Sequence, residues 1–293
     1  MAFSANGEYL LTGDDEEVRV WRAEDGKQVA TVKAKKVLCL AVSKDGRWIA
    51  AGTYWGAVLV WDAKTYEKII SHQEDYNPDV SGVDFSPDST RLVSASRAAS
   101  IWNVAAGKQV QTLDHSWAKA AKYSPQGDRI ATATHDYVRV WDSNNGGLLV
   151  HIPVKVNPWY NTGLLWFNDH LFVVSESKIK HIEAFTGSTV SEWSVPYTDH
   201  FSCIAPPKHG GFIAYSTQRT VTFWNKATHI QLGLIQHPQD IRSIAVSPDD
   251  RFLAIGGRNG KVTINSLSRI TVSILSRWIM VHMSIFLFRL IFP

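Results

Sequence analysis

Five tryptophans recur in this chain at a nearly constant spacing, and each ends a short run of alternating apolar and polar residues. They are Trp21, Trp61, Trp102, Trp141 and Trp224. The first three intervals are 40, 41 and 39 residues, and the fourth, 83, is about twice as long. Such a period indicates a repeated structural unit. A degenerate unit fits into the long interval, with Ala184 expected at its tryptophan position, and one more period ends at Asn265, which gives seven units.

A second phrase recurs with the same period. Its variants are FSANGEYLLTG (3–13), VSKDGRWIAAG (42–52), FSPDSTRLVSA (85–95), YSPQGDRIATA (123–133) and VSPDDRFLAIG (246–256), and residues 166–176 and 205–217 are eroded copies. The Ser-Pro-Asp-Gly core favours a tight turn, because proline presets φ, aspartate caps the backbone and glycine accepts a positive φ. The flanking segments alternate with period two and are predicted to be strands.

Each unit therefore holds four short strands, here called a, b, c and d in chain order. In the second unit they fall near 37–42, 47–51, 57–61 and 67–70. A four-stranded sheet of this size cannot bury both faces alone, but radial stacking buries each face against a neighbour. A sandwich or a single barrel would not predict one tryptophan in every 40 residues. We therefore expect an all-β fold, a seven-bladed β-propeller of four-stranded antiparallel blades, with blade one incomplete at the N-terminus.

The predicted domain covers residues 1–276, followed by an apolar tail at 277–293. Its units are expected near 3–32, 37–70, 80–113, 117–152, 161–193, 201–235 and 241–276.

The residues that end strand c carry a family resemblance. VWD stands at 60–62 and 140–142, with looser forms IWN at 101–103 and FWN at 223–225. With the recurring turns, they make residues 3–267 resemble a WD-repeat β-propeller. The resemblance implies that the five tryptophans are structural, packing between adjacent blades, and that the molecule is a scaffold for other proteins.

The resemblance also implies a hydrogen-bonded tetrad in each blade, of Trp, a Ser/Thr on strand b, a His before strand a and an Asp in the b–c turn. This chain matches it poorly. The Asp position holds, in units one to four, six and seven, Asp15, Trp55, Ser96, His135, Gln218 and Asn259. Unit four comes nearest, with Trp141, Thr132 or Thr134, His115, and Asp136 displaced by one residue; His237 precedes strand a of unit seven. Each missing bond costs about 1 kcal/mol, so we expect modest stability, lowest in unit five.

Composition and the absence of catalytic motifs restrict the classes of function that we expect. The net charge of +3 is small, and KAKK at 33–36 is the only basic cluster, so nucleic acid is not an expected partner. Two distant cysteines, Cys39 and Cys203, suggest neither disulfide nor zinc and favour an intracellular location, cytoplasmic or nuclear. The eleven histidines are scattered, and no catalytic or phosphate-binding motif is present. We therefore expect no enzyme activity, no cofactor and no metal.

Candidate partner-binding residues are those in turns that the fold does not require. Tyr54 and Trp55 replace the usual Asp-Gly turn, and Trp159 and Tyr160 lie in a long d–a connection, 155–163. Arg97 and His135 are further b–c turn positions. Exposed aromatic and arginine side chains on such a rim are typical of protein-binding surfaces. Each of these side chains also has a purely structural interpretation, in which it covers the edge of its own blade.

The apolar tail leaves several interpretations open. Val272–Ser276 is expected to complete blade seven, and 279–288 could enter blade one as its innermost strand, which would remove exposed edges. A membrane anchor is disfavoured because Arg277, His282 and Arg289 interrupt the run, which is shorter than the roughly 20 residues needed. The end could also be an artefact of the gene model or a strand that binds a partner.

The expected function is a non-catalytic scaffold that binds other proteins through the propeller rim. One alternative is a propeller enzyme or small-ligand binder that uses the central channel. Another is a fragment of a larger regulatory protein. A deep polar pocket with convergent His, Asp or Glu would favour the enzyme, and an aromatic-rimmed flat face would favour the scaffold.

Overall fold

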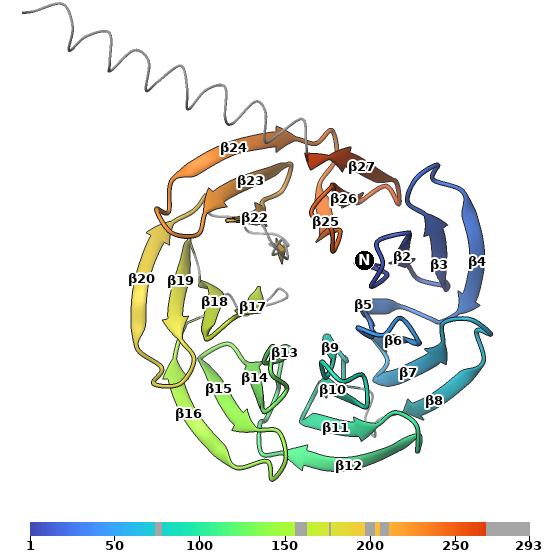
Figure 1. Ribbon diagram of the computed structural model, residues 1–293, viewed down its shortest axis with the longest axis horizontal. Helices are drawn as coiled ribbons and strands as arrows, with labels where there is room; N and C mark the ends of the chain where they lie inside the picture. Colours follow the sequence, from blue (N-terminus) through green and yellow to red (C-terminus); the bar gives the residue numbers. More distant parts are fainter. Residues whose placement is uncertain (74–77, 156–162, 176, 197–202, 206–210, 268–293) are drawn as a thin grey trace, which may run out of the picture.

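The computed structural model describes residues 1–73, 78–155, 163–175, 177–196, 203–205 and 211–267. These residues form seven antiparallel sheets arranged as blades around a ring (Figure 1). Six sheets have four strands, and blade seven has three within the described residues. The predicted all-β, seven-bladed propeller is confirmed. No helix in the described part of the chain is long and apolar enough to cross a membrane.

The strands follow one another as a, b, c and d in each blade. Blades one to four comprise β1 (Ala2–Phe3), β2 (Tyr9–Gly13), β3 (Glu17–Arg22), β4 (Gln28–Lys33); β5 (Val37–Val42), β6 (Trp48–Thr53), β7 (Ala57–Asp62), β8 (Lys68–Gln73); β9 (Gly82–Phe85), β10 (Arg91–Ala95), β11 (Ala99–Asn103), β12 (Lys108–Leu113); β13 (Ala120–Tyr123), β14 (Arg129–Ala133), β15 (Tyr137–Asp142), β16 (Leu148–Pro153). Blades five to seven comprise β17 (Leu164–Phe167), β18 (His170–Ser175), β19 (Lys178–Glu183), β20 (Thr189–Ser194); β21 (Ile204–Ala205), β22 (Phe212–Ser216), β23 (Thr220–Asn225), β24 (Gln231–Gln236); β25 (Ile241–Val246), β26 (Phe252–Gly257), β27 (Val262–Ser266).

The Ser-x-Asp-Gly phrase forms the turn between strands a and b. In blade two, the Ser43 hydroxyl lies 2.6 Å from Asp45 Oδ1, and the same carboxylate oxygen accepts the backbone N–H of Arg47 at 3.0 Å. Gly46 takes a φ of +74°, a left-handed conformation that side chains disfavour. Local sequence chemistry therefore fixes this turn and the register of the two strands beside it.

The pairing of strands c and d places a β-bulge at the tryptophan position in blades one to six. The register shifts between Val140 and Trp141 in blade four, and at the equivalent place in blade five it shifts between His181 and Ile182. Ile182 also pairs with Leu171, as Trp141 pairs with Ile130. The expected placement of Ala184 at the tryptophan position is therefore wrong. The position belongs to Ile182, which lies 41 residues after Trp141 and 42 before Trp224 and so fits the repeat period better than Ala184 does.

The core consists of apolar clusters between adjacent blades. Trp61, Trp102 and Trp141 are 1–3% exposed, and each packs with strand residues of the preceding blade. Trp21 packs towards blade seven, and Trp224 towards blade five. The indole N–H of Trp21, Trp102 and Trp141 donates to Thr12, Ser94 and Thr132 on strand b at 2.7–2.9 Å, and that of Trp224 to Thr222 on its own strand.

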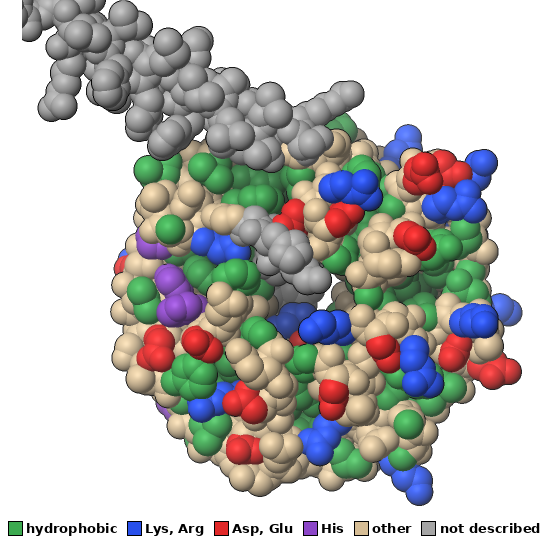
Figure 2. All heavy atoms as spheres, in the orientation of Figure 1, with side chains coloured by type: hydrophobic (Ala, Val, Ile, Leu, Met, Phe, Trp, Pro, Cys, Tyr) green, Lys and Arg blue, Asp and Glu red, His purple; other side chains and the backbone are tan. Residues whose placement is uncertain are grey.

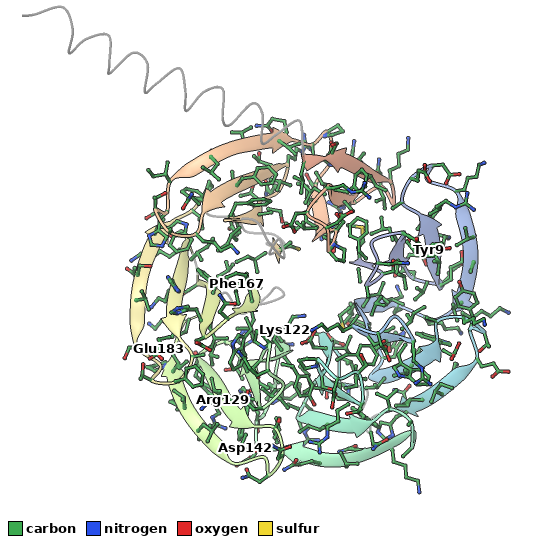
Figure 3. The ribbon with its side chains drawn as sticks, in the orientation of Figure 1. Tyr9, Lys122, Arg129, Asp142, Phe167 and Glu183 are labelled. Atoms are coloured by element: carbon green, nitrogen blue, oxygen red, sulfur yellow. The ribbon has the colours of Figure 1, made fainter. Side chains whose placement is uncertain are left out.

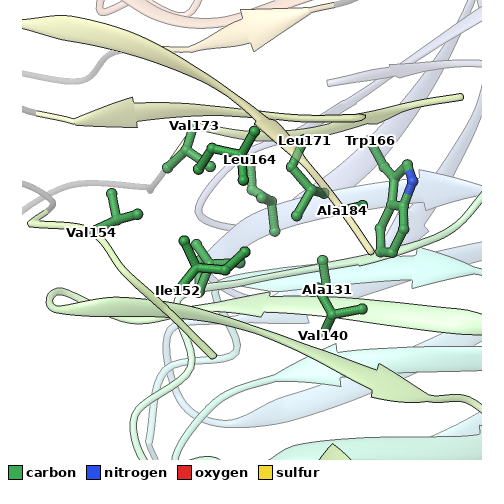
Figure 4. Packing of buried hydrophobic residues seen from close by; sticks show 12 residues of the cluster. Ala131, Val140, Ile152, Val154, Leu164, Trp166, Leu171, Val173 and Ala184 are labelled. Carbon is green, nitrogen blue, oxygen red and sulfur yellow. The ribbon is translucent and has the colours of Figure 1, made fainter. Parts of the chain in front are cut away.

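A different tryptophan contributes to the interface between blades four and five. Trp166, on β17, belongs to the same cluster as Ile182 and Ala184, and its indole N–H donates to the carbonyl of Asn168 at 2.8 Å. Figure 4 shows Trp166 at one end of this cluster, with Leu171 and Ala184 beside it. A smaller residue at the repeat position is thus accompanied by a large aromatic on strand a, which fills the interface.

Blade four retains most of the expected tetrad. The Thr132 hydroxyl accepts the indole N–H of Trp141 and is hydrogen-bonded to Nδ1 of His115. His115 is 1% exposed, and Nε2 has no hydrogen-bond partner among the described residues. Burial first, and the nearby Arg139 and His151 next, lower the pKa of His115 to about 3, so the ring is neutral at physiological pH.

Blade one is closed against blade seven by apolar contacts. β1 pairs with β2 through Ala2 opposite Leu11 and Phe3 opposite Leu10, so this blade has a two-residue strand a. Phe3 and Leu10 share a cluster with Ala254 of β26. The expected strands at 272–276 and 279–288 lie outside the described residues. The edge of β2 that was expected to pair with 279–288 pairs with β1, at Leu10 and Leu11.

Candidate functional site

The candidate residues lie on turns at one end of the strands. Because strands a to d alternate in direction, the b–c turns and the d–a connections fall at the same end of each blade, which we call the b–c face. Tyr54, Trp55, Arg97 and His135 all belong to this face, in blades two, three and four. Trp159 and Tyr160 lie outside the described residues.

Tyr54 and Trp55 form an exposed aromatic pair. Their side chains are 46% and 51% exposed, and their rings meet edge to face with centroids 4.9 Å apart. The turn is held from both sides, because the Tyr54 N–H donates to the carbonyl of Lys36 at 2.8 Å and Gln73 donates to the carbonyl of Trp55. Because the backbone of this turn is already fixed, burying the two exposed rings against a partner costs little conformational entropy.

Trp117 is a further exposed aromatic on the b–c face, and it was not among the residues predicted from the sequence. It lies in the d–a connection between blades three and four, and 59% of it is exposed. Its φ is +59°, a strained conformation for a bulky side chain, and its N–H donates to the carbonyl of Arg97 at 2.8 Å. Strain of this kind clusters at functional sites. The available signal was a tryptophan outside the strand alternation, in the segment DHSW.

Arg97 and His135 flank the connection that carries Trp117. Arg97 is exposed on the b–c turn of blade three, and His135 is half-buried on that of blade four. Nδ1 of His135 is buried without a hydrogen-bond partner among the described residues. Burial, followed by the positive charge of Lys119, lowers the pKa of His135, while burial raises the pKa of Asp79. The structure therefore ties Trp117 to the Arg97 turn and places His135 on the b–c turn of the next blade, with Tyr54 and Trp55 on that of blade two.

No convergent catalytic or metal-binding group stands out in the described structure. An open depression between blades one and two contains none of the candidate residues and mixes both signs of charge; it is lined by Asp15, Glu16, Glu17, Lys33, Ala34, Lys35, Leu59 and Lys68. Near the ring centre, Lys122 (labelled in Figure 3) is paired at 3.0 Å with Asp84 of blade three. Among the described residues, no three His, Cys, Asp or Glu side chains are arranged to hold a metal ion.

Comparison with known proteins finds relatives and a solved structure that match most of this chain. Translation initiation factor 3 subunit I of Pyricularia oryzae is 22% identical over 304 residues, which cover 91% of this chain and 89% of that protein. The pre-rRNA-processing protein crb3/ipi3 of Schizosaccharomyces pombe is 25% identical over 260 residues, covering 80% and 56%. Kuenenia stuttgartiensis hydrazine synthase contains a chain of the same fold, with a TM-score of 0.78, 14% identity, and coverage of 90% and 94%.

The family model for the WD domain, G-beta repeat, matches residues 1–22, 26–62, 65–103, 107–142 and 229–264, more than half of the chain. These segments contain four of the five strand-c tryptophans and leave out Trp224. With the seven blades, the recurring turns and the blade tryptophans, this match shows that the chain belongs to the WD40 repeat family.

Proposed function

We propose that this protein is a non-catalytic scaffold that binds other proteins through the b–c face of blades two to four. The observation that carries the proposal is Trp117, a strained tryptophan that is 59% exposed and tied to the Arg97 turn. A large aromatic held rigidly in solvent stabilises a complex rather than the free protein, since its apolar area is buried only on binding.

Tyr54 and Trp55 extend this surface onto blade two, and Arg97 and His135 provide polar groups at its edge. Aromatic residues with arginine are enriched at the centres of protein interfaces. The modest net charge of +3 supports a protein partner more than a nucleic acid, which demands an extended basic surface. Trp159 and Tyr160 are proposed as part of the same surface.

The relatives support the same proposal. One of them is by its name a subunit of a translation initiation factor, and another is named for pre-rRNA processing. Both names fit a propeller that works as part of a larger assembly. We extend this to an intracellular role for the present chain, in the cytoplasm or the nucleus.

A comparative affinity capture tests the proposal. Wild-type protein, a Trp55→Ala/Trp117→Ala variant and a Phe185→Ala/Ile230→Ala variant are used as baits in the same extract, and captured proteins are quantified. Phe185 and Ile230 are 41% and 63% exposed on c–d turns at the opposite end of the strands, so they match the loss of apolar area. We expect specific partners to be lost with the first variant and kept with the second. Equal capture by all three baits would refute the assignment of this face.

A further inference from the structure

A group of basic side chains lies on the b–c face where blade six meets blade seven. Three segments, which we call the basic corner, come together there: the b–c turn of blade six (216–220), the connection between the blades (236–242) and the b–c turn of blade seven (257–261). They carry four positive charges and one negative charge, those of Arg219, Arg242, Arg258, Lys261 and Asp240. This excess equals the formal net charge of the whole chain, +3. Figure 2 shows, on one face of the ring, basic and acidic side chains next to one another, so a concentration of one sign is not the general pattern.

Backbone hydrogen bonds hold the three segments of the basic corner against one another. The carbonyl of Arg219 accepts the N–H of His237 at 2.7 Å, and the N–H of Arg258 donates to the carbonyl of Asp240 at 2.8 Å. A Cβ on Gly257 would lie 3.0 Å from Cε1 of His237, so the turn of blade seven packs closely on the connection. The backbone positions that carry the basic side chains are therefore fixed before a partner binds, which reduces the entropy lost on binding.

One carboxylate, that of Asp240, lies against guanidinium groups from both blades. Arg219 Nε lies 3.0 Å from Asp240 Oδ1, and Arg258 Nη1 lies 3.8 Å from Oδ2. The arginine side chains are nevertheless 63% and 67% exposed. Ion pairs with this much exposure contribute little to stability, because water screens them. The fold itself therefore gains little from placing two arginines here.

The basic side chains have hydrogen-bond donors that the protein does not use. A guanidinium group carries five N–H donors. Among the described residues, the side chain of Arg219 donates one hydrogen bond, to Asp240, and that of Arg258 donates none. Lys261 is exposed and forms no ion pair with a described residue. Paired guanidinium N–H groups match the two oxygens of a carboxylate, so the corner favours a ligand rich in carboxylates.

The neighbouring blade limits the size of the anion that can lie here. Blade one lies next to blade seven in the ring (Figure 1), and four consecutive acidic residues, 14–17, follow its strand β2 on the same b–c face. A nucleic acid binds through an extended series of phosphate contacts, so it would reach this acidic turn and be repelled. A few consecutive acidic residues of a protein fit within the basic corner alone.

We propose that the basic corner binds a short acidic segment of a partner protein, with Arg219 and Arg258 donating to its carboxylates and Lys261 adding positive charge. The inference rests on the proposed role as a protein-binding scaffold, and it names the chemistry of one partner segment. It also adds blades six and seven to the binding face. Asp240 keeps the two guanidinium groups side by side until the carboxylates of the partner bind.

The test is fluorescence anisotropy of a labelled acidic peptide, GDEEDEDLG, mixed with the full-length protein. We expect saturable binding that weakens as NaCl is added, and much weaker binding of GNQQNQNLG, in which every carboxylate is replaced by an amide. Arg219→Gln/Arg258→Gln should lower the affinity by about tenfold or more. Arg22→Gln/Arg251→Gln is the matched control, because these arginines are 47% and 70% exposed and each pairs with an aspartate at the opposite end of the strands. The control should bind the peptide as the wild type does.

Further measurements separate this proposal from the aromatic surface and from nucleic-acid binding. Trp55→Ala/Trp117→Ala should keep the peptide affinity, so failure of one assignment leaves the other standing. The Tm of each variant shows that it is folded. Absence of saturable binding by the wild type, or unchanged affinity in Arg219→Gln/Arg258→Gln, would overturn the proposal. Tighter binding of a single-stranded oligothymidylate through the same two arginines would overturn it as well and assign the corner to nucleic acid.

Discussion

Thr132 links the tryptophan and the histidine of blade four, and its replacement by valine gives the sharpest test of how a blade is held together. The side chain is fully buried and serves both Trp141 and His115. Valine has nearly the same shape, so the packing is retained while both hydrogen bonds disappear. The indole N–H and the imidazole Nδ1 are then buried without partners, and each such loss costs about 1–3 kcal/mol, which together gives about 2–6 kcal/mol for Thr132→Val.

Thermal unfolding followed by circular dichroism measures this loss. With an unfolding entropy of about 2.1 cal/mol/K per residue, the expected decrease in Tm is about 3–10 °C. Thr112→Val is the matched control, because Thr112 is exposed on β12 and its hydroxyl accepts a hydrogen bond from the exposed side chain of Gln109. It should change stability by less than about 0.5 kcal/mol. If Thr132→Val unfolds at the same temperature as the control, the hydrogen-bonded network contributes nothing to the stability of the blade, which would refute this prediction.

Three further predictions concern other parts of the ring. Because the folded pKa of His115 is about 3 and that of a free histidine is about 6.5, protonation favours the unfolded state: stability is complete above pH 6.5 and decreases towards pH 3, and His115→Gln should flatten Tm against pH. Gly52, on β6, faces blade three, and a Cβ there would lie 2.5 Å from Val80 Cγ1, so Gly52→Ser should lower the unfolding free energy by about 1–3 kcal/mol, measured in urea; increased stability would contradict this. Trp117→Asn should leave Tm unchanged or raise it, because asparagine tolerates the φ of +59°, while partner capture falls; a large drop in Tm would show that Trp117 is structural.

Local and periodic features made the fold predictable from the sequence. The Ser-x-Asp-Gly turns are formed by contacts between residues close in sequence, such as that of Ser43 with Asp45. The tryptophan spacing gives the length of one blade, and so the number of blades. Any chain with these two signals must stack its sheets to bury their faces. The seven blades therefore followed from the sequence, and so did the turn positions of Tyr54, Trp55, Arg97 and His135.

Tertiary structure decided what the period could not. It moved the tryptophan position of blade five from Ala184 to Ile182, because the register of strand c against its two neighbouring strands shows only in their pairing. It also exposed Trp117 and placed Arg219 and Arg258 at the carboxylate of Asp240, because exposure and side-chain neighbours are set by how strands pair and blades face one another. The sequence by itself determined the architecture of this WD40 protein, and the packing of blade against blade determined which of its side chains are left to bind something else.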